Sequence, residues 1–157
     1  MIEIEINENN LKKFLQDIRT EDKEELVFYF GEDFEKKFVE IAKSTKNTYF
    51  VSDENEAPIA IGGFEEFKNN KNIFQTWLLC TNKLKNNKKE LFKYIKTKLK
   101  SYKENSFVLF NYIYRTNFKS LNFIKSLGFE IVDLKNDNFK LFYYTKGKSL
   151  DIRYITD

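Results

Sequence analysis

Hydrophobic and polar positions in the first third of the chain change period twice. Residues 1–6 alternate with a period of two, which predicts a first strand. A helical spacing follows, carried by Leu11, Phe14, Leu15 and Ile18, and the acidic stretch 21–30 continues it. Gly31 predicts a break before a second helix, whose apolar positions are Phe34, Phe38, Val39, Ile41 and Ala42. Two helices are therefore expected after the first strand.

Three strands are expected next, at 48–52, 58–67 and 73–80, where β-branched and aromatic residues are frequent. Polar turns at 53–56 and 69–72 separate them. Gly62 and Gly63 lie inside the second of these strands. They predict either a bulge or a place where a neighbouring side chain comes close to the backbone.

The second half alternates helices and strands. Residues 86–103 form an amphipathic helix pattern with an apolar stripe of Leu91, Ile95, Leu99 and Tyr102, and 107–115 form a strand. The next helix is expected between Asn117, a capping residue, and Gly128, a left-handed stop. Strands at 130–133 and 139–145 form a final hairpin across 135–138. The order β-α-α-β-β-β-α-β-α-β-β fits one domain, 1–157, with its core at 2–145 and a tail at 146–157.

The composition of the 157 residues limits the classes of protein that are expected. Hydrophobic residues make up 41% and aromatic residues 17%, which is enough for a core. Cys80 is the only cysteine, so the chain forms no internal disulfide and contains no C-x-x-C zinc motif. The acidic N-terminal residues are unlike a signal peptide, and no apolar run reaches the ~20 residues that cross a bilayer. A cytoplasmic protein without membrane or metal partners is expected.

Charge and the absence of histidine narrow the chemistry. With no histidine, Ser-His, Cys-His and His-metal mechanisms are excluded, leaving carboxylate, tyrosine, lysine, cysteine or water for proton transfer. Residues 1–66 carry 17 acidic and 8 basic side chains, and residues 67–157 carry 7 and 19. The basic half is either a solvated surface or a surface for an anion. Nucleic acid is disfavoured because only three arginines occur.

One motif resembles a known family. Asn117, Ser120, Phe123, Gly128 and Phe129 have the spacing of the last helix of the GCN5-related N-acetyltransferases (the GNAT superfamily). The resemblance implies an α/β (α+β) acyl-CoA N-acyltransferase fold. Its mixed, mostly antiparallel sheet would have six to seven strands flanked by about four helices. It also implies acetyl-CoA as the ligand, an amine as the acceptor, and no metal.

The same resemblance implies roles for individual residues. The fourth strand would hold the pantetheine arm through its backbone, and the helix after it would hold the phosphates. Side chains on the fourth and fifth strands would face the acceptor, although core packing is the alternative for several of them. The implied set is Leu78, Leu79, Cys80, Asn86, Asn87, Lys88, Asn117 and Ser120 for the cofactor, Gln75 and Trp77 for the substrate cleft, and Asn111, Tyr112 and Tyr114 as catalytic candidates.

Two positions depart from the family pattern. The stretch 81–89 lacks the glycines with which active members wrap a pyrophosphate. Ile124 stands where many active members have a tyrosine that protonates the departing thiolate, and isoleucine has no proton to give. Some members work without that tyrosine, so the chemistry is weakened rather than removed.

A second resemblance covers residues 58–145. The tryptophan strand at 75–81, the Asn-Tyr strand at 111–114 and the helix ending at Gly128 are similar to acetyltransferase-like proteins of T7-like phages, which include an internal virion or morphogenesis protein. This similarity implies a degenerate acetyl-CoA site in a binding or virion-associated protein, with a phage or host protein partner, located in the host cytoplasm or the virion. The alternative is an active N-acetyltransferase that acts on a small-molecule or protein amine.

Overall fold

The computed structural model describes residues 1–106, 108–135 and 138–146, and the chain divides into two compact units. Unit 1 comprises Met1–Glu65 and Trp77–Ile95, and unit 2 comprises Glu66–Thr76 and Lys96–Asp157. The expected turn at 135–138 lies partly outside the described residues, and the expected tail lies almost wholly outside them.

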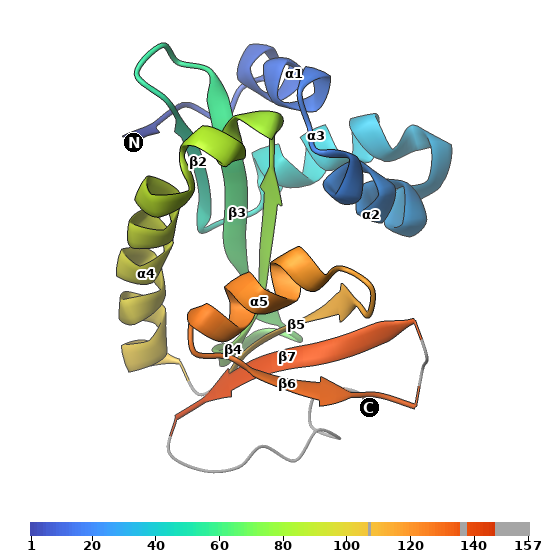
Figure 1. Ribbon diagram of the computed structural model, residues 1–157, viewed down its shortest axis with the longest axis vertical. Helices are drawn as coiled ribbons and strands as arrows, with labels where there is room; N and C mark the ends of the chain where they lie inside the picture. Colours follow the sequence, from blue (N-terminus) through green and yellow to red (C-terminus); the bar gives the residue numbers. More distant parts are fainter. Residues whose placement is uncertain (107, 136–137, 147–157) are drawn as a thin grey trace. The chain divides into compact units, whose positions relative to one another are not determined.

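The strands form one mixed sheet of seven in the order β1-β2-β3-β4-β5-β7-β6, labelled in Figure 1. Their bounds are Ile2–Glu3 for β1, Thr48–Ser52 for β2, Pro58–Phe67 for β3, Asn70–Cys80 for β4, Val108–Tyr114 for β5, Glu130–Asp133 for β6 and Phe139–Thr145 for β7. Strands β4 and β5 pair in parallel, whereas the pairs β1–β2, β2–β3, β5–β7 and β6–β7 are antiparallel. The predicted fold class is confirmed.

The bounds of three strands differ from the prediction, and the smallest difference is in β5, which ends at Tyr114 rather than at residue 115. The first strand is two residues long, because the chain leaves the sheet before α1 begins. The fourth strand begins at Asn70 rather than at Ile73. Lys68 and Asn69 both have positive φ angles and make the turn from β3 alone, which is the backbone of a tight two-residue hairpin.

Three α-helices of unit 1 follow β1: α1 (Glu8–Gln16), α2 (Thr20–Phe30) and α3 (Phe34–Ser44). Asn7 caps α1 by accepting a hydrogen bond from the Asn10 N–H at 2.8 Å. Gly31, with a φ of +73°, ends α2 as predicted. The prediction of one continuous helix through residue 30 was wrong, because residues 17–19 leave the helix to pair with the end of β4.

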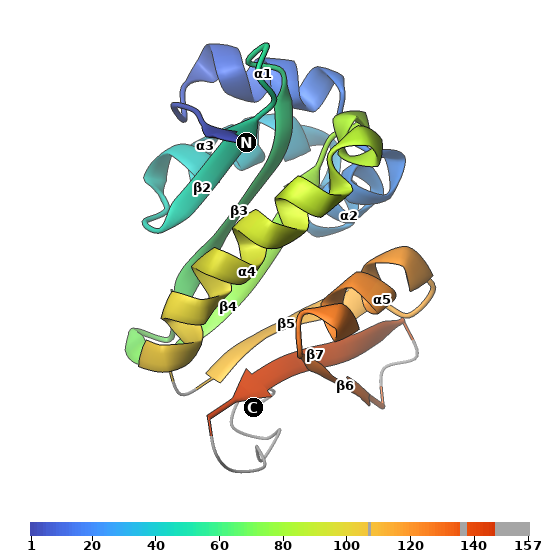
Figure 2. The ribbon, with the colours of Figure 1, turned by 60° about the vertical axis from the view of Figure 1, so that its left-hand side comes forward.

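Unit 1 has helices on both faces of its strands (Figure 2). The first half of α4 (Lys88–Asn105) packs on one face, and α1 to α3 pack on the other. Neighbouring strand residues divide between the faces: Phe50, Ile61 and Leu79 join the core under α1 to α3, whereas Val51, Ala60 and Cys80 join the core under α4. This is the alternation that a sheet covered on both faces requires.

The paired glycines of β3 make room for Trp77. A Cβ atom on Gly62 would lie 2.6 Å from the carbonyl oxygen of Trp77, and one on Gly63 would lie 3.0 Å from its indole Nε1. Any side chain at Gly62 would therefore clash with the backbone of β4. The second of the two predicted explanations, a close-lying neighbour, is confirmed.

Unit 2 holds the parallel ladder between β4 and β5, the antiparallel pairs of β5 with β7 and of β6 with β7, and α5 (Phe118–Ser126). Figures 1 and 2 show α5 lying over β5 and β7. Leu121 and Ile124 are the buried residues of this helix. Gly128 follows it with a φ of +92°, so the predicted left-handed stop is confirmed.

Candidate functional site

The end of β4 in unit 1 is bound by the segment between α1 and α2. The Cys80 N–H donates to the Asp22 carboxylate at 2.8 Å, and the Cys80 carbonyl accepts from the Arg19 N–H at 3.0 Å. One position further, the Asn82 N–H donates to the carbonyl of Asp17 at 3.0 Å, and Ile18 forms a bridge with Thr81. Residues 17–19 thus act as a short extra strand on β4.

Asp22 and Arg19 form a bidentate ion pair behind this contact. Nε and Nη2 of Arg19 donate to the two carboxylate oxygens at 2.8 and 3.1 Å, and Asp22 is only 3% exposed. Burial raises the pKa of Asp22, and the bonds from Arg19 and from the Cys80 N–H offset only part of that increase. We take the carboxylate to be ionised at neutral pH, because it accepts hydrogen bonds from both partners.

The predicted cofactor residues of β4 have different surroundings. Both backbone groups of Cys80 are bonded within unit 1, and burial raises the pKa of its thiol to about 12. Leu79 is buried in the core under α1 to α3. Because peptide groups alternate along a strand and Thr81 donates to Ile59 of β3, the N–H and C=O of Leu78 point to the same edge as those of Cys80.

A short 3-10 helix, η2 (Asn82–Asn86), stands at the stretch where the sequence lacks the glycines of the pattern that it resembles. Thr81 holds its start, because the hydroxyl donates to the Pro58 carbonyl at 2.7 Å and accepts from the Lys83 N–H. The Asn87 amide donates to the Lys83 carbonyl at 2.8 Å, and α4 begins at Lys88. The exposed residues Asn86 and Lys88 flank this junction, where charge is available but the glycines of a backbone anion nest are missing.

In unit 2 the structure brings Gln75 and Asn111 together. The Gln75 Nε2 donates to the Asn111 Oδ1 at 3.0 Å, and the Asn111 Nδ2 donates to the Thr76 carbonyl at 2.6 Å. The same Oδ1 accepts from the Tyr112 N–H at 2.8 Å. The backbone ladder between β4 and β5 runs from Ile73 and Val108 to Gln75 and Phe110, so the Asn111 amide extends the connection by one residue.

The two tyrosine candidates are packed against aromatic neighbours. The Tyr112 ring lies edge-on to Phe110 with centroids 6.1 Å apart, and burial raises the pKa of its phenol. The Tyr114 ring stacks on Phe139 at 4.6 Å. Both rings therefore contribute to the packing of unit 2.

Asn117 and Ser120 lie at the start of α5. The Asn117 Oδ1 accepts from the Ser120 N–H at 3.3 Å, which confirms the predicted helix cap. Ile124 is 9% exposed and belongs to the buried side of α5. The sequence motif therefore has a structural explanation within this helix.

Arg19, Asp22 and Glu25 were not anticipated from the sequence. Glu25 lies one turn after Asp22 on α2 and is partly buried. Burial raises its pKa to about 7, and the negative charge of Asp22 adds to the increase. The sequence signal was the single arginine within the first 114 residues, three positions before an aspartate in an acidic helix.

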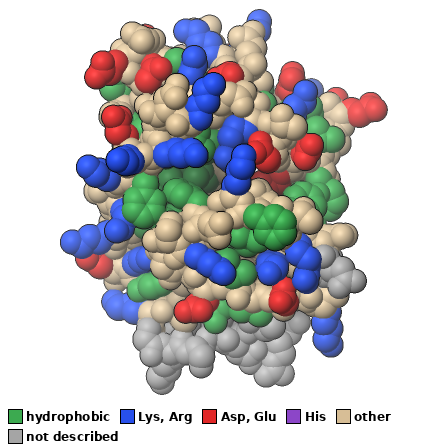
Figure 3. Space-filling model, viewed as in Figure 1, with side chains coloured by type: hydrophobic (Ala, Val, Ile, Leu, Met, Phe, Trp, Pro, Cys, Tyr) green, Lys and Arg blue, Asp and Glu red, His purple; other side chains and the backbone are tan. Residues whose placement is uncertain are grey.

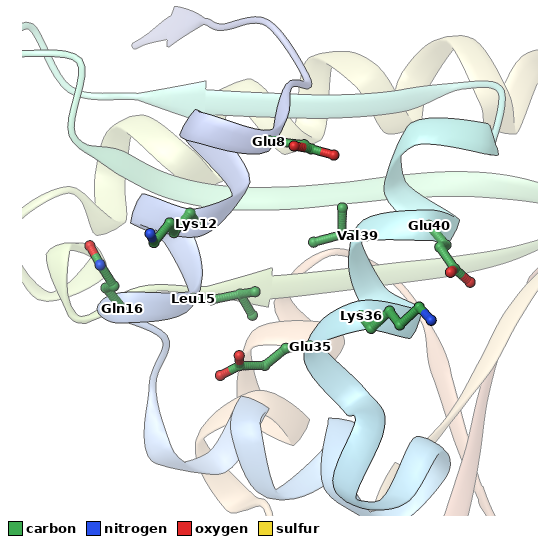
Figure 4. Close-up of a pocket in the computed structure, with 8 residues that line it drawn as sticks. All are labelled: Glu8, Lys12, Leu15, Gln16, Glu35, Lys36, Val39 and Glu40. Atoms are coloured by element: carbon green, nitrogen blue, oxygen red, sulfur yellow. The ribbon is translucent and has the colours of Figure 1, made fainter.

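A pocket of about 650 Å³ opens between α1 and α3 (Figure 4). Leu15 and Val39 provide its apolar part, and charged side chains of both signs surround them. The complete lining is Glu8, Lys12, Leu15, Gln16, Glu35, Lys36, Val39 and Glu40. It contains none of the residues predicted for the site.

Basic side chains lie along α4 at the left of Figure 3, and those that belong to α4 itself are all lysines. Within the described residues, no group of three or more acidic, cysteine or histidine side chains could hold a metal ion. No helix in that part of the chain is long and apolar enough to span a membrane.

Comparisons with known proteins place the fold. No family model and no curated protein sequence matches the chain. Among solved structures, it is similar to a GCN5-related N-acetyltransferase from Kribbella flavida, with a TM-score of 0.68 and 9% identity over 92% of this chain and 97% of that one. It is also similar to aminoglycoside 6'-acetyltransferase type Ii, with a TM-score of 0.64 and 14% identity over 92% and 97%.

A third similar structure is the Campylobacter jejuni N-acetyltransferase PseH in complex with acetyl coenzyme A, with a TM-score of 0.51 and 19% identity over 82% of this chain and 94% of that one. At these identities the similarity establishes the N-acetyltransferase fold. The resemblance to phage proteins stays a prediction.

Proposed function

We propose that the protein is an acyl-CoA-dependent N-acyltransferase that passes an acyl group to an amine. The observation that carries the proposal is the fold, which is shared with N-acetyltransferases over nearly the whole chain. A thioester supplies an activated acyl carbon, so the transfer needs only a positioned amine that can lose a proton. A chain without histidine can meet that need through a carboxylate or water.

The residues predicted to bind acyl-CoA differ in how well their surroundings suit that role. The Leu78 peptide groups suit a ligand that pairs with β4 like an added strand. Cys80 offers nothing further to such a ligand, because Asp22 and Arg19 already use its N–H and C=O. Asn117 and Ser120, and the basic side chains near Lys88, are the remaining candidates for the pantetheine and phosphate contacts.

A non-catalytic binding protein is the second candidate. It is favoured by the η2 helix in place of a glycine loop, and by the engagement of all three catalytic candidates in bonds or ring packing. A phage-type origin, with a phage or host protein as the partner, is the setting proposed for this candidate. Such a protein would bind its partner through the predicted substrate cleft or another surface and would catalyse no reaction.

Calorimetric titration with acetyl-CoA, coenzyme A and a desulfo analogue tests the first proposal. Micromolar binding that raises protection of the Leu78 amide in NMR hydrogen exchange, and leaves the Cys80 amide unchanged, is expected. Binding without thiol release in the presence of a panel of amines would favour the second candidate. Undetectable heat at millimolar ligand would remove acyl-CoA from both.

A further inference from the structure

One side of α2 combines a carboxylate with two aromatic rings. Glu25, Phe28 and Tyr29 are spaced i, i+3 and i+4, so they are neighbours on the helix surface. The two rings lie edge to face, with centroids 5.5 Å apart and planes at 82°. Phe28 is 55% exposed and Tyr29 is 49% exposed, although aromatic side chains of this size are normally buried.

Glu25 has no hydrogen bond and no ion pair within the described part of the chain, although it is partly buried. The charged groups that act on its carboxylate are Asp22 and Arg19, which already bond to each other. A carboxylate withdrawn from water without a partner is unfavourable in its ionised form. A cationic ligand would stabilise the ionised carboxylate of Glu25, and this would favour its binding at this position.

The helix that carries this side is held firmly. Leu26 is 5% exposed and packs in the core with Phe14 and Phe38, while Asp22 bonds to the end of β4. These contacts fix the rotation of α2 about its axis. The exposed rings and Glu25 are thus presented by a rigid support.

We propose that this side of α2, formed by Glu25, Phe28 and Tyr29, binds a primary alkylammonium group. The carboxylate pairs with the ammonium, and the ring faces contact the cation and the methylene groups next to it. The role of this ligand as the acceptor amine rests on the proposed function, whereas its binding to α2 does not.

The surrounding charge has the sign that such a ligand requires. Residues 20–33 carry six acidic side chains and one basic one. Hydrophobic and acidic side chains are adjacent over this region, at the right of Figure 3. An acidic surface raises the local concentration of cations and speeds their association.

Elsewhere the chain holds one of its own ammonium groups in the same manner. In unit 2 the Lys103 Nζ lies 4.8 Å from the ring centroid of Tyr144 and 5.6 Å from that of Phe129, and it donates to the Leu127 carbonyl at 2.8 Å. One ammonium group of this protein is thus surrounded by an oxygen acceptor and two aromatic rings.

The ammonium could belong to a free polyamine or to a lysine side chain of a basic protein segment. Spermidine and a short lysine-glycine peptide are the probes, titrated by calorimetry into the full chain at pH 8 and physiological salt. Glu25→Gln is compared with Glu24→Gln, which removes the same charge from an exposed position on another side of α2. Tyr29→Ala is compared with Tyr29→Phe, which keeps the ring.

Glu25→Gln is expected to weaken binding of at least one probe tenfold or more, and Glu24→Gln less than twofold. Tyr29→Ala should weaken it several-fold while Tyr29→Phe does not. The probe that binds identifies the source of the ammonium. Equal losses for the two glutamate variants, or no binding of either probe at millimolar concentration, would overturn the inference. The acetyl-CoA titration is independent, so a failed ammonium site leaves the proposed transferase standing, and the reverse also holds.

Discussion

The carboxylate of Asp22 accepts a hydrogen bond from the N–H of Cys80 at 2.8 Å, across 58 positions of sequence. The same carboxylate also accepts hydrogen bonds from Nε and Nη2 of Arg19. One buried side chain thus joins the start of α2 to the end of β4. It also decides which backbone groups of β4 remain for a ligand.

Replacing Asp22 should be among the most damaging single changes in unit 1. Asp22→Asn removes the charge that balances Arg19, which is itself only 19% exposed at its side chain. Removing one partner of a buried pair leaves an uncompensated charge, so we expect a loss of roughly 3 kcal/mol in the free energy of unfolding. Urea unfolding followed by circular dichroism measures it. Glu24→Gln, at an exposed position, is the control, and an equal stability for both variants would contradict the pairing.

Glu25 should make stability depend on pH. Its pKa is about 7 in the folded chain and near 4.5 in the unfolded chain, so between these values the folded state binds more protons. The free energy of unfolding therefore falls as pH rises from about 4.5 to 7. Glu25→Gln removes this penalty. It should be more stable than the wild type by about 2 kcal/mol at pH 8, and by much less at pH 4.5.

Thermal unfolding at pH 4.5, 6 and 8 tests that expectation. Glu24→Gln serves again as the control, because it makes the same change in net charge on the exposed side of the helix. A wild type and a Glu25→Gln variant whose melting temperatures run parallel across this range would show that Glu25 is ordinary surface carboxylate.

Most of the fold could be predicted because it follows from local signals. The predicted bounds of β2, β3, β6 and β7 are correct, because these strands are runs of apolar and aromatic residues set off by turns, and the Asn117 cap with the Gly128 stop defined α5. The break between α1 and α2 could not be predicted in this way. It depends on the pairing of residues 17–19 with β4, a contact between distant parts of the chain that leaves no periodic signal.

The site was less predictable than the fold, for the same reason. The resemblance predicts Gln75 and Asn111 near an acceptor, but their amides bond to each other and to the backbone. No sequence pattern indicates Glu25, because its burial arises from tertiary packing. A residue type reveals what a side chain can do, whereas its neighbours decide whether that capacity is already used.

Replacing the glycine at each of two helix ends by alanine should lower the stability by different amounts. Gly31 and Gly128 both have positive φ, which costs a residue with a Cβ about 1 kcal/mol or more. A Cβ on Gly31 would meet nothing within 4 Å, whereas one on Gly128 would lie 3.2 Å from the Lys103 Nζ. Gly31 also has a ψ of −151°, a backbone conformation that is essentially restricted to glycine, whereas the flexible end of Lys103 can move away from Gly128. Gly31→Ala should therefore lose more stability than Gly128→Ala. Chemical denaturation of both variants decides this, and a larger loss for Gly128→Ala would show that the contact with Lys103 outweighs the backbone strain.

Loss of the Asn111 side-chain amide should lower the free energy of unfolding by more than the sum of its single hydrogen bonds suggests. Asn111→Ala removes the donor to Thr76 and the acceptor for both Gln75 and the Tyr112 N–H, leaving partly buried polar groups unsatisfied. Each such group costs about 1 to 3 kcal/mol, whereas Gln75→Ala breaks a single bond and should cost about 1 kcal/mol. In a double-mutant cycle, Gln75→Ala should cost almost nothing once Asn111 is alanine, because its partner has already gone. Urea unfolding of the four proteins measures this coupling, and strictly additive losses would show that the two amides act independently.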